Sequence, residues 1–86
     1  MSTYTETDLF DAVYRVAAEL GAEEGLMAPE ATLVNVGLDS LDVVELSQAL
    51  KKQLNVAITP KDFAEAETFA DAVNVLKAAL ASPAQV

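Results

Sequence analysis

The sequence predicts an all-α fold, a four-helix bundle with a long loop between the first and second helices and a short third helix. The chain holds only three Gly and three Pro in 86 residues and is rich in Ala, which favours helices. Its apolar residues recur at helical spacing, and no alternating run is long enough to indicate a strand. This length has room for one domain, residues 1–86.

The first helix is predicted over about residues 5–20. Thr5 and Asp8 have the spacing of a capping box, in which each side chain bonds the other residue's backbone N–H. Gly21 suits the left-handed position that ends many helices. The apolar stripe of this helix is Leu9, Val13, Val16, Ala17 and Leu20.

Residues 21–38 show no sustained period and include two Gly and a Pro, so they are expected to form a long surface loop. We expect its apolar residues Leu26, Leu33 and Val36 to pack into the core and hold the loop down. The second helix, over about residues 39–54, begins at Asp39 as the N-cap. Its predicted buried side is Val43, Leu46, Leu50 and Leu54.

Two further helices follow an interruption at residues 55–58. Thr59 as a cap, with Pro60 in the first helical position, predicts a short helix over about residues 60–66. Thr68 with Asp71 predicts a last helix over about residues 68–81. Its buried stripe is predicted to be Phe69, Val73, Leu76 and Leu80.

Composition excludes several classes of function. The formal net charge is −9, which gives no electrostatic attraction for nucleic acid. The chain has no Cys and no His, so disulfides, thiolate catalysis and Cys/His metal sites are excluded and no metal site is expected. The longest stretch without a charged residue is residues 78–86, too short to span a membrane. The start lacks the basic and apolar regions of a signal peptide, so we expect the protein in the cytoplasm. Nothing in the sequence indicates an oligomer, so we expect a monomer.

The predicted second helix has an unusual outward side. At 100° per residue, Leu41 lies about 160° from Val43 and Val44 lies about 100° from it, so both apolar side chains should point at water. They stand beside Asp42, Glu45 and Gln48. An apolar spot ringed by carboxylates suits docking onto a basic partner surface. Single exposed apolar residues are also common, so this face could equally be plain surface.

Ser40 occupies the first position of this helix. Unpaired backbone N–H groups and the helix dipole favour a phosphate there, so a phosphodiester on the hydroxyl would be well placed. The simpler alternative is that Ser40 and Asp39 share the capping of the helix.

The residues around Ser40 resemble the attachment motif of acyl carrier proteins. The motif is Gly37-Leu38-Asp39-Ser40-Leu41 followed by Asp42-Val43-Val44-Glu45-Leu46. The resemblance implies that Ser40 receives 4′-phosphopantetheine from coenzyme A through a Mg²⁺-dependent phosphopantetheinyl transferase, and that the arm's thiol carries acyl groups. It also implies that Asp39 is the acid before the serine, that Leu41 contacts partners, and that Val44 and Gln48 complete a recognition face with Asp42 and Glu45. The partners would be a ketosynthase, an acyltransferase or a ligase, and the carrier itself would not be an enzyme.

The chain departs from this family in two places. Val36 stands where a Leu usually precedes the Gly, and Lys51 and Lys52 stand where fatty-acid carriers tend to be acidic. The lysines favour a dedicated carrier in a specialised polyketide or hybrid pathway over a housekeeping fatty-acid carrier. The alternative is that Lys51 and Lys52 are simply solvated surface residues. Peptidyl or aryl carriers more often have Gly-Gly-x-Ser, so Leu38-Asp39 favours the acyl type.

A cavity for the acyl chain is one interpretation of the apolar residues between the predicted second and third helices. The candidates are Leu46, Leu50, Ile58, Phe63 and Val73. Ordinary core packing explains the same residues without a ligand.

Three other functions are conceivable for such a chain. A helical interaction module without a cofactor would use the acidic face alone. A serine hydrolase lacks a His base, and a calcium site at residues 23–24 lacks the spaced ligands of an EF-hand loop.

Overall fold

Helices make up most of the chain. A computed structural model describes residues 4–81. These residues form the helices α1 (Glu6–Glu19), α2 (Ser40–Leu54), α3 (Pro60–Ala64) and α4 (Phe69–Ala81), with a 3₁₀ turn, η1 (Glu24–Leu26), in the long loop. Within that range there is no strand, only an isolated bridge between Thr32 and Thr68. The predicted all-α fold, with a long first loop and a short third helix, is confirmed.

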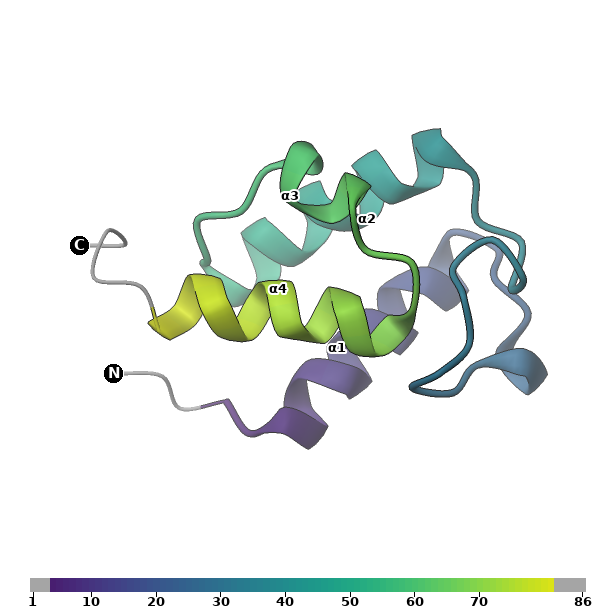
Figure 1. Cartoon of the computed structure of the whole chain (residues 1–86), viewed down its shortest axis with the longest axis horizontal. Coiled ribbons are helices and arrows are strands. Elements are labelled where there is room, and N and C mark those ends of the chain that lie inside the picture. Colours follow the sequence, from purple (N-terminus) through teal and green to yellow (C-terminus); the bar gives the residue numbers. More distant parts are fainter. Residues whose placement is uncertain (1–3, 82–86) are drawn as a thin grey trace.

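The helices pair in two groups (Figure 1). Helix α1 packs against α4, where the Tyr14 ring meets the Phe69 ring edge-on at 5.0 Å and Lys77 forms an ion pair with Glu6. Helix α3 packs against α2 on the other side, and the long loop closes one end of the bundle. No helix within residues 4–81 combines the length and the apolarity needed to cross a bilayer.

Each helix begins where its polar residues predicted. The capping boxes at Thr5, Asp39 and Thr59 all form, each with the Asp three residues later. Helix α1 ends in a Schellman motif, in which Gly21 has φ +106° and the Ala22 N–H bonds the Ala17 carbonyl at 3.0 Å. The ends of these helices are therefore determined by local hydrogen bonds.

One apolar core joins all the elements. The two largest fully buried side chains, Phe63 and Phe69, come from α3 and α4. The loop contributes Leu33 and Val36, as predicted, together with Leu38. The loop is thus part of the packed structure on which α2 stands.

The expected burial of Leu26 was wrong, and three residues of the apolar stripes are only partly buried. Leu26 does not enter the core: its side chain is 54% exposed, because the η1 turn directs it outward while Ala22 and Met27 beside it take the inner positions. Val43 is only half-buried, as are Leu20 and Leu80. These three residues lie at the edge of the core, where no neighbouring helix or loop fully covers the apolar side of their own helix.

Helix α3 is two residues shorter than predicted. The Ala66 N–H bonds the Phe63 carbonyl at 3.0 Å, and the next two N–H groups, of Glu67 and Thr68, bond the Asp71 carboxylate. Those bonds already belong to the start of α4, so α3 stops at Ala64.

Candidate functional site

The first turn of α2 is held by two carboxylates. Asp39 Oδ1 accepts the Asp42 N–H at 2.9 Å, and Asp42 Oδ2 accepts the Asp39 N–H at 3.1 Å. These bonds satisfy two of the backbone donors at the helix start. Both acids therefore have a structural task here, whatever else they contact.

Ser40 is left out of this cap. Its side chain is exposed, and its hydroxyl forms no hydrogen bond with another residue in the described part of the chain. The backbone N–H groups of Ser40 and Leu41 also meet no acceptor among residues 4–81. The capping role that could have explained Ser40 is thus filled by Asp39 and Asp42, and a hydroxyl and two N–H groups remain open to solvent.

The segment before Ser40 is firmly placed. Gly37 has φ +101°, a backbone conformation that residues with a side chain rarely adopt. Its N–H bonds the Val34 carbonyl at 3.0 Å. The Leu33 N–H bonds the Glu67 carbonyl at 2.9 Å, which ties this loop to the connection between α3 and α4. The position of Ser40 therefore depends on contacts from three parts of the chain.

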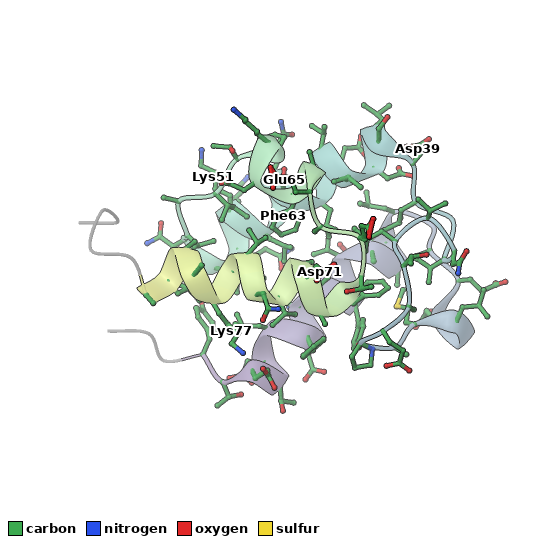
Figure 2. The ribbon with its side chains drawn as sticks, in the orientation of Figure 1. Asp39, Lys51, Phe63, Glu65, Asp71 and Lys77 are labelled. Atoms are coloured by element: carbon green, nitrogen blue, oxygen red, sulfur yellow. The ribbon has the colours of Figure 1, made fainter. Side chains whose placement is uncertain are left out.

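A groove of about 600 Å³ lies beside Ser40, between α2, α3 and the loop. Figure 2 places Asp39 near the start of α2 and Phe63 on α3. The residues that line the groove are Thr32, Leu33, Val34, Asn35, Leu38, Asp39, Ser40, Val43, Val44, Pro60, Phe63, Ala64, Ala66 and Glu67. Its walls are mostly apolar and Ser40 belongs to its rim, so a flexible chain attached there could fold back into it.

The cavity residues expected from the sequence lie deeper. Of the five, only Phe63 lines this groove. Leu46, Leu50, Ile58 and Val73 are each at most 2% exposed and form part of the closed core below it. The sequence did not indicate most of the actual walls, because they come from an irregular loop and from the end of α3 rather than from one helical stripe.

The outward side of α2 agrees with the helical geometry except at one residue. Leu41 is 66% exposed, and Glu45 and Gln48 are exposed as well. Asp42 is half-buried, in keeping with its capping bonds. Val44 does not point fully at water: it is half-buried and forms part of the groove wall. The exposed row on α2 is therefore Leu41, Glu45 and Gln48.

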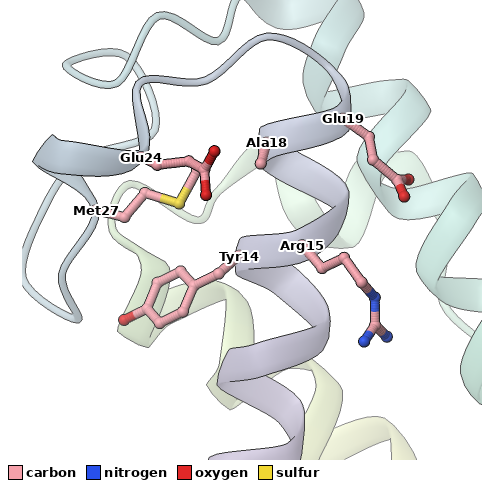
Figure 3. Close-up of a pocket in the computed structure, with 6 residues that line it drawn as sticks. All are labelled: Tyr14, Arg15, Ala18, Glu19, Glu24 and Met27. Atoms are coloured by element: carbon pink, nitrogen blue, oxygen red, sulfur yellow. The ribbon is translucent and has the colours of Figure 1, made fainter.

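A second groove lies between α1 and η1, away from Ser40 (Figure 3). Arg15 and Glu19 extend to one side of α1, and Tyr14 extends to the other, toward Met27. Burial raises the pKa of the Tyr14 phenol, and the negative charges of Glu30 and Asp11 add to this, so Tyr14 stays protonated at neutral pH. Within residues 4–81, no group of three or more Asp or Glu is arranged to hold a metal ion.

Comparison with known proteins identifies the class. A family model described as "Phosphopantetheine attachment site" matches residues 15–76. A protein named "Acyl carrier protein" from Syntrophobacter fumaroxidans (strain DSM 10017 / MPOB) is 39% identical over 62 residues, covering 71% of this chain and 76% of that protein. The matched region contains α2, the groove and the loop before Ser40. The chain therefore belongs to the phosphopantetheine-binding family of acyl carrier proteins, which confirms the resemblance seen in its sequence.

Membership defines the general activity. Proteins of this family are carriers rather than catalysts, and their covalent cofactor is 4′-phosphopantetheine. They work with a phosphopantetheinyl transferase and with biosynthetic enzymes that use the carried group.

Proposed function

We propose that Ser40 is the residue that carries 4′-phosphopantetheine, and that the chain presents acyl groups on this arm to biosynthetic enzymes. The observation that supports this most directly is the exposed Ser40 hydroxyl at the start of α2, which has no hydrogen-bond partner among residues 4–81. The neighbouring N–H groups of Ser40 and Leu41 lie at the positive end of the helix dipole, where a phosphate is favoured. Esterification of this hydroxyl breaks no bond of the Asp39 cap.

The attachment step balances simply. Ser40 Oγ attacks the phosphorus next to the pantetheine unit of coenzyme A. The Oγ–P bond forms, the P–O bond to adenosine 3′,5′-bisphosphate breaks, and the hydroxyl proton passes to a base of the transferase. When bound, the group supplies the thiol that this Cys-free chain lacks.

The residues around Ser40 then have separate tasks. Asp39 and Asp42 hold the first turn through their mutual capping bonds. Leu41 gives partners an apolar contact, and Glu45 and Gln48 continue the contact surface along α2. Glu45, which has no capping bond, is the carboxylate best placed to meet a basic side chain of the transferase, a ketosynthase, an acyltransferase or a ligase.

The groove beside Ser40 is suited to shelter the start of an apolar acyl chain, against Leu38, Val43, Val44 and Phe63. Deeper entry requires Leu46, Leu50, Ile58 and Val73 to move apart, since they are closely packed.

For the pathway, Lys51 and Lys52 favour a specialised polyketide or hybrid route over housekeeping fatty-acid synthesis. The cytoplasm remains the predicted compartment.

Intact-mass measurement tests the assignment of Ser40. The wild-type chain, incubated with coenzyme A, Mg²⁺ and a broad-specificity phosphopantetheinyl transferase, should gain the mass of one arm, and Ser40→Ala should gain nothing. Ser47→Ala is the matched control, because Ser47 is buried with its Oγ bonded to the Val44 carbonyl at 2.7 Å. This variant should still be modified.

Full modification of Ser40→Ala would refute the assignment. A wild-type chain that always keeps the mass of the bare polypeptide would favour the cofactor-free interaction module instead.

A further inference from the structure

The last turn of α2 carries two lysines in an otherwise acidic chain. Lys51 and Lys52 are both exposed, and neither forms an ion pair with another described residue. Residues 1–50 contain ten acids and one base, whereas residues 51–86 contain four of each. Cations near a helix C-terminus stabilise the helix dipole, which accounts for their position along the helix but not for the side on which they lie.

One of the two lysines, Lys52, shares the outward side of α2 with the row next to Ser40. At 100° per residue, Leu41, Glu45, Gln48 and Lys52 fall within a band of about 60°, and Lys51 lies on the side of Val44. Seven residues separate Glu45 from Lys52, or about 10 Å along the helix. This is close to the Debye length of about 10 Å at 0.1 M salt, so a docked partner meets two separate charges of opposite sign rather than their average.

The structure leaves open space at these lysines. A groove of about 560 Å³ is lined by Gln48, Lys51, Lys52, Asn55, Val56 and Ala57. Asn55 adopts the left-handed conformation at φ 53°, which turns the chain away from the helix axis. Figure 2 shows Lys51 on the part of α2 far from Asp39. A side chain of a partner lying along α2 can therefore enter this groove, next to Lys51 and Lys52.

We propose that α2 is a dipolar docking surface, and that its partners carry a basic side chain opposite Glu45 and a carboxylate opposite Lys51 and Lys52. The lysine pair selects against enzymes whose docking patch is basic throughout, because two ammonium groups then face a like charge. This inference rests on the proposed carrier function.

A double-mutant cycle tests the inference. The probe is a ketosynthase whose carrier-docking patch contains only basic charges. A variant of this enzyme has Glu in place of the basic residue that lies nearest Lys52 in the complex, as located by chemical cross-linking. The carriers are wild type, the double variant Lys51→Glu with Lys52→Glu, and the control Lys61→Glu, which places a new acid on exposed α3 instead. Every carrier is first checked for its arm by intact mass, so a failure of the proposed function is seen before docking is measured.

Wild type should give a kcat/KM about threefold to tenfold higher with the Glu variant of the enzyme than with the original. The double lysine variant should reverse this preference, and Lys61→Glu should keep it. The same preference with wild type and the double lysine variant would overturn the proposal. A shift by Lys61→Glu of about half that of the double variant or more would also overturn it, because Lys61→Glu makes half the change in net charge and net charge alone would then explain the effect.

Discussion

Two helix pairs of the bundle, α1 with α4 and α2 with α3, differ in how completely the space between them is closed. Between α1 and α4, the Tyr14 and Phe69 rings meet at 5.0 Å and an ion pair joins Glu6 to Lys77. Between α2 and α3, the short α3 leaves a groove of about 600 Å³ next to Ser40. The α1 and α4 pair, the closed side, can stabilise the fold without contributing to the site. The α2 and α3 pair, the open side, can therefore leave the Ser40 hydroxyl unpaired and the groove unfilled.

Removing one aromatic ring from each side tests this contrast most strongly. Phe69→Ala should destabilise the chain by about 3–5 kcal/mol, since Phe69 is fully buried on the closed side. Phe63→Ala should cost less although Phe63 is equally buried, because it borders the groove and its neighbours can relax into open space. Urea unfolding followed by circular dichroism measures both free energies. A larger loss for Phe63→Ala would show that the groove side supports the fold as much as the closed side does.

A backbone substitution next to the site should have a smaller effect. Gly37 has φ +101°, and a Cβ added there meets no atom within 4 Å, so Gly37→Ala introduces conformational strain alone. We expect a loss of about 1–2 kcal/mol. Gly25 is the matched control, since its surroundings are equally open and its φ is not positive. Gly25→Ala should change the free energy of unfolding by at most about 0.5 kcal/mol, and equal effects of the two substitutions in urea unfolding would contradict the strain argument.

Local hydrogen bonds explain why so much of the helix pattern was predictable. Thr5, Asp39, Thr59 and Thr68 each bond the N–H of an Asp three residues later, and such a bond depends on a few adjacent residues only. The outward row on α2 follows from helical period in the same way, so Leu41, Glu45 and Gln48 could be placed without knowledge of the fold.

The groove could not be predicted, because it depends on contacts between distant segments. Its loop wall is fixed by the bond from the Leu33 N–H to the Glu67 carbonyl and by the bridge between Thr32 and Thr68. Leu26 was misplaced for a related reason: apolar character predicts burial, but an irregular loop has no period to show which of its apolar residues turn inward. The place of Ser40 at the first position of α2 could be predicted, because the Asp39 and Asp42 capping box that starts the helix is local.

The smallest expected effect concerns the pH dependence of stability at the start of α4, which acid titration measures. The Thr68 and Glu67 backbone N–H groups donate to the Asp71 carboxylate at 3.1 Å and hold its pKa below the ordinary value. A lowered pKa in the folded state means that Asp71 stabilises the fold fully above its ordinary pKa of about 3.9 and loses this contribution as the pH falls through the lower, folded value. Asp71→Asn should therefore be less stable than wild type at neutral pH, and the two should converge as the pH falls below about 4.

Asp11→Asn is the control for this titration, because Asp11 is exposed on α1 and forms no hydrogen bond through its side chain with another described residue. Thermal unfolding of the three proteins between pH 7 and pH 2 would show whether the gap closes for Asp71→Asn alone. A gap that stays constant down to the lowest pH would mean that the Asp71 side chain acts through its shape and not through its charge. The loop wall at Thr68 would then be held by the neutral hydrogen bonds between the segments rather than by this carboxylate.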